Sequence, residues 1–569
     1  MMSEKLLYEV KDMSGGLNVG TRPHLIRDNE VQDCQNIDLL PGQAATCDGY
    51  GLINSLSAER IYNYAKRDGT VQLVQQVADK LYIDGTLVKS GIVGLLSFET
   101  YQNLLFCTNI ETSFIWNGLI SVWGIEKPGT TCTATVSGDA GLPNEGRSYY
   151  VTFVNDRGQE SNPSPASNTV SPSLKKVDLT DIPTGESNTA KRRIYASATI
   201  GSTTGTWLLV EIADNTTTTY TDNMAGSSLI IGNALETDND PPTKSSYILE
   251  HKNRLFLAQG SFLYFSKLNK PESFPLSNYI PCNDGGDRIT GIKVLNDWVV
   301  ILKERSIQML SVEGEPSSWN FKTINDSRGC PYPETIQLLD NNIIFMGVDD
   351  LYQIQPTLVQ DERSIVPVGT RIESLLVNES SPISVDYDGR YWLKISKSII
   401  IYDYRRNYFT KYVFPDVPKS FCVTTANKLL FGTIKGTMQY GMSKNFNGVA
   451  ISSFVVGKDF DMGSRSRMKK IRKIFVYYRK ETVSDSMYVQ FGTDKVGYGD
   501  KLTIGLANGY MEWGPNSLWG RLWGGQSSPG QESQTIFQKD NYFRVKMGSD
   551  SIPSQFYGFG IIYKIKRIR

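Results

Sequence analysis

The chain has 569 residues, of which 40% are hydrophobic and 21% charged, as in folded soluble proteins of several domains. Lys and Arg (59) balance Asp and Glu (59), which argues against a nucleic-acid coat or a membrane-surface protein, because these are usually basic. The seven Cys are scattered without a C-x-x-C motif, and the start lacks the apolar region of a signal peptide. These features favour folding in a reducing cytoplasm.

The first predicted unit is an N-terminal arm, residues 1–57. Gly15 and Gly16 favour a flexible turn over a regular element. Asp28 is a plausible cap for a short helix, with Val31 and Cys34 on one face. We therefore expect a loosely built segment ahead of the main fold.

A sequence repeat follows, in which a polar turn precedes four or five apolar residues, a second turn and another apolar run. The turns are marked by Asp68, Asn103, Asn253, Asp297, Asn342, Asp388 and Asn427. The first step is 35 residues, and the steps after Asn253 are 44, 45, 46 and 39. A period of about 40–50 residues with several short strands predicts propeller blades, because stacked small sheets bury their faces. A β-sandwich of hairpins is the alternative, but hairpins require no fixed long period.

One step of the repeat is far too long, at 150 residues from Asn103 to Asn253. Residues 128–239 are rich in Thr and Ser and carry short apolar runs, which predict an inserted fibronectin- or immunoglobulin-like sandwich. Without this segment the step is 38 residues, one normal blade. The propeller then comprises residues 58–127 and 240–450, with about seven blades, and residues 451–569 form a C-terminal β domain. The predicted fold class is all-β.

Few residues suggest chemistry. His251 stands in a polar turn, so a turn role is expected rather than catalysis. The run from Asp284 to Asp287 lacks the alternating acids of a calcium loop and reads as an inter-blade turn. Asp349 and Asp350 are adjacent, so on a strand they would point to opposite faces and could not act as a pair. We expect no catalytic residue, no cofactor and no metal.

The most suggestive feature is a basic run near the start of the C-terminal domain. It consists of Arg465, Arg467, Lys469, Lys470, Arg472 and Lys473. Such a cluster can hold DNA phosphates, contact a neighbouring subunit or form a solvated face. Aromatic residues are not interleaved as base-stacking platforms would require. The sequence leaves the three interpretations open.

Four short motifs in the arm occur in a fixed order: Gly15-Gly16-Leu17-Asn18, Asp28-Asn29-Glu30, Gln35-Asn36-Ile37-Asp38 and Asp48-Gly49-Tyr50. Placed ahead of a propeller period, this order resembles the amino-terminal stretch of tail nozzle, or tail tubular hub, proteins of short-tailed bacteriophages. The resemblance spans most of the chain, although its sharp motifs are few. It implies a ring of six copies below the portal, around the channel through which the genome leaves.

The predicted function is therefore a structural virion protein, not an enzyme, assembled in the host cytoplasm and located in the tail. Its expected partners are other copies of itself, the portal adaptor, other tail proteins and the passing DNA, without sequence preference. A chain without net charge suits a conduit, because a strongly basic bore would hold DNA phosphates. The alternatives are a carbohydrate-active propeller enzyme, lyase or hydrolase, and a propeller scaffold that binds proteins.

Overall fold

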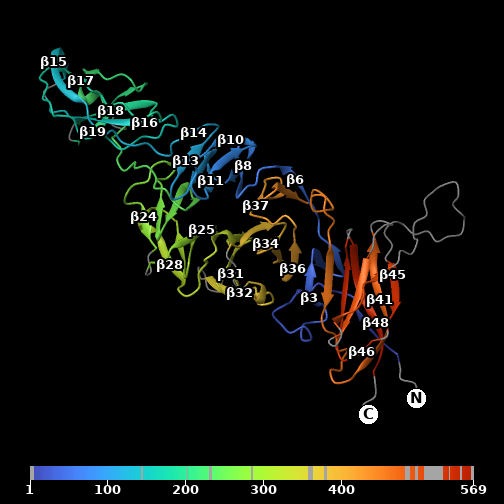
Figure 1. The fold of residues 1–569 in the computed structure, drawn as a ribbon. Coiled ribbons are helices and arrows are strands. Elements are labelled where there is room, and N and C mark those ends of the chain that lie inside the picture. The colour runs from blue at the N-terminus through green and yellow to red at the C-terminus, as the bar shows by residue number, and fades with distance from the viewer. Residues whose placement is uncertain are drawn as a thin grey trace, which may run out of the picture.

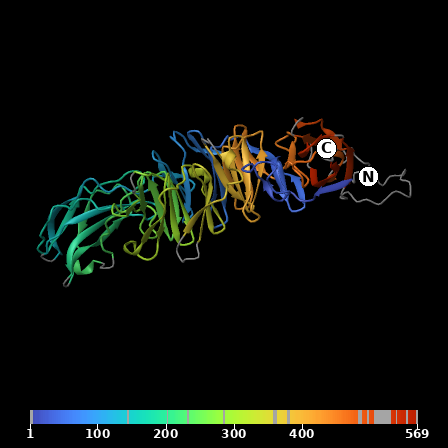
Figure 2. The same cartoon turned by 90° about the horizontal axis from the view of Figure 1, so that it is seen from below.

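The computed structural model describes residues 5–565, apart from 143–144, 201–202, 230–232, 283–285, 357–362, 377–380, 481–486, 494–496, 505–529, 537 and 551–553. The chain forms an elongated molecule with three parts in a row: an inserted sandwich, a propeller and a terminal sandwich (Figure 1, Figure 2). Helical structure in the described residues is limited to η1 (Gly226–Ser228), η2 (Pro316–Ser318), η3 (Pro333–Thr335) and α1 (Glu373–Leu376).

The propeller is built from seven four-stranded antiparallel sheets in the described part of the chain. The first four, in chain order, are β7 (Arg60–Ala65), β8 (Val71–Val77), β9 (Lys80–Ile83) and β10 (Thr86–Lys89); β11 (Ser97–Tyr101), β12 (Leu104–Thr108), β13 (Ser113–Trp116) and β14 (Ile120–Ser121); β21 (Tyr247–His251), β22 (Arg254–Gln259), β23 (Phe262–Phe265) and β24 (Tyr279–Pro281); and β25 (Ile289–Leu295), β26 (Trp298–Lys303), β27 (Ile307–Ser311) and β28 (Asn320–Asn325).

The last three blades follow without another long interruption. They are β29 (Gln337–Leu339), β30 (Asn342–Met346), β31 (Leu351–Pro356) and β32 (Arg363–Pro367); β33 (Ile383–Tyr387), β34 (Arg390–Ile395), β35 (Ser398–Asp403) and β36 (Tyr408–Val413); and β37 (Ser420–Val423), β38 (Leu429–Thr433) and β39 (Gly436–Tyr440) with β6 (Tyr50–Asn54). The predicted all-β propeller of about seven blades is confirmed.

The turns that set the sequence period all lie between the first and second strands of a blade. Asn and Asp tolerate the left-handed backbone conformation that such tight turns need, because their short side chains bond locally. Asn103, Asn253, Asp388 and Asn427 have φ between 53° and 64°. In the β29–β30 hairpin this role belongs to Asp340 (φ 50°), and Asn342 begins β30.

The last blade is completed by a strand from the far end of the sequence. β6 pairs with β39 in an antiparallel register, with Tyr50 opposite Tyr440 and Asn54 opposite Thr437. The first strand of this blade, β37, also contacts β7 of the first blade. Both contacts close the ring between its two chain ends, so residues 50–54 belong to the propeller.

The insertion between β14 and β21 forms a sandwich of two three-stranded sheets (Figure 1). One sheet contains β15 (Thr133–Leu142), β17 (Lys175–Thr180) and β20 (Tyr220–Asp222), and the other β16 (Tyr149–Val154), β18 (Lys191–Ile200) and β19 (Thr203–Ile212). Alternate side chains of both sheets, including Val151, Leu179 and Ile194, form its own buried core. The predicted inserted β-sandwich is thus present.

The terminal sandwich combines strands from both ends of the chain. One seven-stranded sheet contains β1 (Leu6–Val10), β4 (Ile37–Leu40), β5 (Gln43–Thr46), β41 (Lys469–Lys480), β45 (Gly530–Thr535), β46 (Lys539–Asp540) and β48 (Ser554–Ile565). The other contains β2 (Gly16–Leu17), β3 (Glu30–Gln35), β40 (Ser453–Gly457), β42 (Met487–Thr493), β43 (Gly497–Tyr498), β44 (Leu502–Ile504) and β47 (Phe543–Ser549). The segment expected as an arm supplies five of these strands.

The prediction of a short helix after Asp28 is wrong. Residues from Glu30 form the strand β3, which pairs in parallel with β2 and antiparallel with β40. Val31 and Cys34 are buried in the core of the terminal sandwich. Tertiary pairing with two neighbours outweighs the local capping preference on which the helix prediction depended.

Candidate functional site

The motifs that carry the family resemblance lie at the joint between the propeller and the terminal sandwich. Asn36 has a φ of 52° and donates its side-chain amide to the carbonyl oxygen of Ser452 over 2.9 Å. Its side-chain oxygen accepts the backbone N–H of Val413 over 2.7 Å. Asn36 therefore ties blade strand β36 to the chain just before β40.

Asp38, on β4, meets the same blade with a charged contact. Arg390 of β34 donates Nη1 to Asp38 Oδ1 over 2.7 Å, and the hydroxyl of Tyr412 donates to the same oxygen. Burial raises the pKa of the Asp38 carboxyl, while the Arg390 charge and the Tyr412 hydroxyl oppose this rise. The pair connects the two parts of the molecule where water is largely excluded.

Tyr50, at the start of β6, fills the core between the last two blades. Its ring stacks on Phe446 with 5.0 Å between centroids and packs edge-on against Phe431. Its hydroxyl donates to Asp416 Oδ2 over 3.1 Å. Gly49 just before it passes so close to Asn445 that a Cβ there would clash with that residue's backbone.

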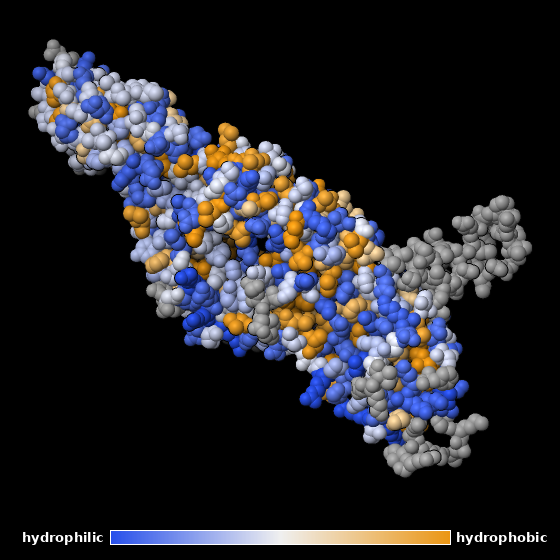
Figure 3. Space-filling model, viewed as in Figure 1, coloured by the Kyte–Doolittle hydropathy of each residue, from blue (hydrophilic) through white to orange (hydrophobic). Residues whose placement is uncertain are grey.

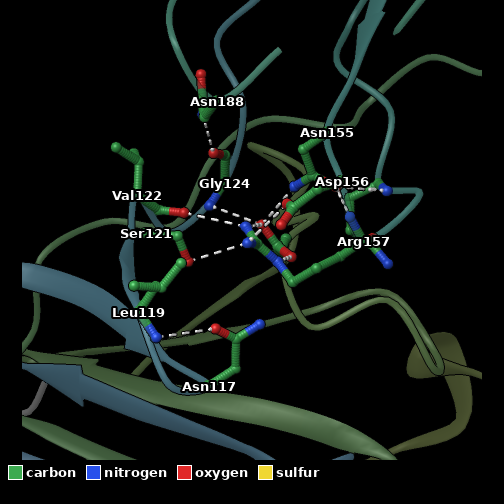
Figure 4. A network of polar contacts seen from close by, with 11 residues as sticks. Asn117, Leu119, Ser121, Val122, Gly124, Asn155, Asp156, Arg157 and Asn188 are labelled. Atoms are coloured by element: carbon green, nitrogen blue, oxygen red, sulfur yellow. Dashed lines mark hydrogen bonds and ion pairs between the residues drawn. The ribbon is translucent and has the colours of Figure 1, made fainter. Parts of the chain in front are cut away.

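The joint at the other end of the propeller contains a nearly buried ion pair (Figure 4). Arg157, in the loop after β16, donates Nε to Glu272 Oε1 over 2.6 Å and Nη2 to Oε2 over 2.8 Å. It also donates to Ser121 Oγ and to the carbonyl oxygen of Val122. The Glu272 side chain is 1% exposed. The inserted sandwich is therefore fixed to blade residues by charge-assisted hydrogen bonds.

The basic run predicted from sequence does not act as one patch. Lys469 is fully buried, and its ammonium donates to the carbonyl oxygens of Ser464 and Asn541. Burial lowers the pKa of this ammonium. Arg465 and Arg467 lie in the exposed turn before β41, and Arg465 pairs with Asp461 over 3.3 Å. Lys469 is thus a structural residue.

The partly exposed members of the run belong to a row of like charges across three strands. Lys470 on β41 stands directly opposite Lys539 on β46 and Lys564 on β48. Lys473 follows on the same strand, with its ammonium 5.1 Å from the Phe475 ring centroid, and Arg472 occupies the bulge between them. Like charges directly opposite one another destabilise a sheet.

The other residues considered from sequence have structural roles in the described chain. His251 donates Nε2 to the carbonyl oxygen of Asp297 over 3.2 Å, and burial lowers its pKa. Asp287 accepts Ser306 Oγ over 2.7 Å, whereas Asp284 lies outside the described residues. Asp349 accepts the hydroxyl of Tyr352 over 2.9 Å. No group of ligating side chains among the described residues could hold a metal.

A feature that the sequence did not predict lies on the propeller axis. Residues from all seven blades line a cavity of about 360 Å³. Both terminal nitrogens of Arg60 donate to the carboxylate of Glu334 there, and Glu99 and Lys293 lie close to this pair. Burial raises the pKa of the Glu99 carboxyl to about 7 and lowers the pKa of the Lys293 ammonium.

A sequence signal for this cluster exists. Glu99 and Lys293 each stand four residues before the turn residue of their blade, Asn103 and Asp297. That position lies on the innermost strand, where Leu249 occupies the corresponding place in the third blade. A charged residue at an axial position of the repeat would have pointed to the cavity.

Comparisons with known proteins add no function. No family model matches the sequence, and no curated protein is similar to it. Three of the similar solved structures are the extracellular domain of a one component system from B. thetaiotaomicron (10% identity, 74% of this chain, TM-score 0.24), regucalcin from Agrobacterium tumefaciens (11%, 53%, 0.26) and the Pan2 WD40 domain of Neurospora crassa (8%, 74%, 0.27). The matches cover 57%, 96% and 97% of those chains. Such low scores carry no argument about function.

Among the described residues, no helix has the length and apolarity needed to cross a bilayer.

Proposed function

We propose that this chain is a structural subunit of the tail of a short-tailed bacteriophage. In this role, copies form the nozzle ring around the DNA ejection channel, six of them as the family resemblance implies. The partners are other copies, the portal adaptor and further tail proteins, and the genome passes without sequence-specific contact. The protein acts by its shape, as part of a wall, rather than by catalysis.

The observation that carries this proposal is the way in which the three parts are joined. Each joint contains a charge-assisted pair, the nearly buried Arg157 with Glu272 on one side and the half-buried Arg390 with Asp38 on the other. Breaking a buried pair costs about 3–5 kcal/mol, so the joint that contains Arg157 and Glu272 resists bending. A subunit that must keep its position while DNA moves past it needs this stiffness.

The position of the resemblance motifs supports the same role. Asn36 and Asp38 each bond across the joint between the propeller and the terminal sandwich, and Tyr50 packs between the last two blades beside it. These motifs therefore specify an architecture of propeller plus terminal sandwich. The resemblance would then reflect a shared architecture rather than a shared reaction.

The basic face of the terminal sandwich is the proposed contact with an anionic neighbour. Among its members are Lys470, Lys539 and Lys564, aligned across three strands. Opposite charge on an adjacent subunit, or the DNA backbone, would neutralise this row.

The test is localisation in particles of the phage that encodes the protein. Antibody fragments raised against the inserted sandwich, residues 133–222, should label the tail in negative-stain images, and tail reconstructions should contain a ring of this chain. Label spread over the capsid, or particles that lack the protein, would refute the proposal. A monomer in solution with no copies in particles would favour the protein-binding scaffold instead.

A further inference from the structure

The cavity on the propeller axis has no part in the wall role proposed above. Its volume of about 360 Å³ lies within the range of ligand sites, which is about 300–1,000 Å³. Figure 3 shows the propeller face hollowed near its centre. A purely structural disc gains nothing from an open axis lined with charged groups, because each such group loses hydration there.

The charged groups of the cavity cancel one another. Arg60 and Lys293 supply two positive charges, and Glu99 and Glu334 supply two carboxyl groups. An anion would meet the two acids, and a cation would meet the two bases. The lining therefore disfavours ionic ligands and favours a neutral ligand that both donates and accepts hydrogen bonds.

One donor on this wall still lacks an acceptor. Arg60 uses both terminal nitrogens on Glu334, but its buried Nε has no hydrogen-bond partner among the described residues. A buried donor without an acceptor destabilises the folded state, because it has lost its hydrogen bonds to water. Because this Nε has almost no accessible surface, a ligand oxygen in the cavity reaches it only when the Arg60 side chain shifts.

Apolar surface completes the lining. The rings of Tyr62, Phe98, Tyr247 and Phe421 come from four different blades, and the side chains of Ser384 and Gln337 add polar groups between them. Sites of this kind bind ligands with apolar faces and a ring of polar edges. Among neutral ligands, a pyranose sugar has both properties, with C–H faces and adjacent hydroxyls.

We propose that the propeller axis is a binding site for one neutral sugar unit of a saccharide. Glu99 and Lys293 bind adjacent hydroxyls, the Arg60–Glu334 pair binds a further oxygen, and the aromatic rings contact the C–H faces. The proposal concerns binding only, since Glu334 is held by Arg60 and cannot act freely as a second catalytic carboxylate. It is independent of the tail role.

The test uses the full chain and four probes: the methyl glycosides of glucose, galactose and mannose, and N-acetylglucosamine. Saturation-transfer NMR should detect binding of at least one probe. Glu99→Gln and Phe421→Ala, on different blades, should each weaken it about tenfold or more, as expected when a buried partner is lost. Glu111→Gln, on the exposed turn after β12, is the matched control and should leave binding unchanged.

The unmodified protein provides a second measurement that needs no variant. A sugar bound on the axis must slow hydrogen exchange in strands β11 and β25 more than in the terminal sandwich. The proposal is overturned if none of the four sugars binds, if inorganic phosphate or a short neutral peptide binds in their place, or if exchange on the axis stays unchanged. If Glu99→Gln and Phe421→Ala both fold and both still bind the sugar as the wild type does, the proposal is also overturned.

Discussion

The ion pair between Arg157 and Glu272 offers the sharpest test of the rigid joints. We consider Arg157→Met, which keeps much of the side-chain volume but removes the guanidinium. The Glu272 carboxylate would then lie 1% exposed, without its cation. It would keep the side-chain amide of Asn155 at 3.0 Å and the backbone N–H of Gly124 at 3.1 Å.

The magnitude follows from the burial of the pair. Removing one partner of a buried pair costs about 3–5 kcal/mol, because the other charge is left uncompensated. The surface pair Lys191–Glu211, whose side chains are 48% and 31% exposed, provides the matched control. Lys191→Met should cost less than about 1 kcal/mol. The double variant Arg157→Met/Glu272→Met should be less destabilised than Arg157→Met alone, since it leaves no buried charge.

Hydrogen exchange resolves the joint from the rest of this multi-part chain, for which a single melting temperature is poorly defined. In Arg157→Met, exchange in peptides spanning 117–124 and 153–158 should accelerate roughly 150- to 5,000-fold, as a loss of about 3–5 kcal/mol in local opening free energy implies. The propeller strands other than β14 should be little affected. If Arg157→Met exchanges like Lys191→Met at these peptides, the joint does not depend on this pair and the stiffness argument fails.

Three further predictions concern other parts of the chain. Gly49→Ala should destabilise the propeller by about 1–3 kcal/mol in chemical denaturation, because the added Cβ would clash with the backbone of Asn445. Gly129→Ala is the control and should be near neutral, because a Cβ there meets nothing within 4 Å. Equal effects of the two changes would contradict this prediction. The raised pKa of Glu99, about 7, means that the folded state binds a proton more tightly than the unfolded one, so its contribution to stability is present at low pH and is lost as pH rises toward 7. Between pH 5 and 8, the hydrogen-exchange protection of β11, corrected for intrinsic exchange, should therefore fall less with pH in Glu99→Gln than in the wild type, and parallel curves would refute the assignment. Lys564→Glu should stabilise the isolated chain by about 0.2–1 kcal/mol by relieving the lysine row, yet reduce incorporation into tails, as measured by quantitative immunoblots of purified particles. Lys428→Glu, on an exposed propeller turn, should change neither, and normal incorporation of the Lys564 variant would remove the anionic-partner argument.

The parts of the fold that repeat could be predicted from sequence. Asn253 and Asp388 mark tight turns because few residues accept a positive φ, and the same need recurs in each blade. The insertion could be located because it broke an otherwise steady spacing. Turn preferences and repeat spacing depend on residues that are close in sequence, so they can be used without knowledge of the tertiary structure.

The remainder depended on pairing between distant segments. Glu30 was expected in a helix because nothing nearby indicates that β40, more than 400 residues later, would pair with its strand. Lys469 reads as a surface charge until the carbonyl oxygens of Ser464 and Asn541 are seen around it. Glu99 and Lys293 could be predicted to lie together on the axis only after the blades were aligned on their turns, because both residues stand four positions before the turn residue.

The pairing of β6 with β39 has a consequence for biosynthesis. Residues 50–54 leave the ribosome early, but their partner strand is made roughly 380 residues later, which is about 20–80 s at 5–20 residues per second. During this interval an incomplete disc exposes unpaired strand edges, which are sites of aggregation. Nascent chains should therefore require chaperone protection until translation passes Tyr440, and a ribosome stalled before that codon would release an aggregation-prone product.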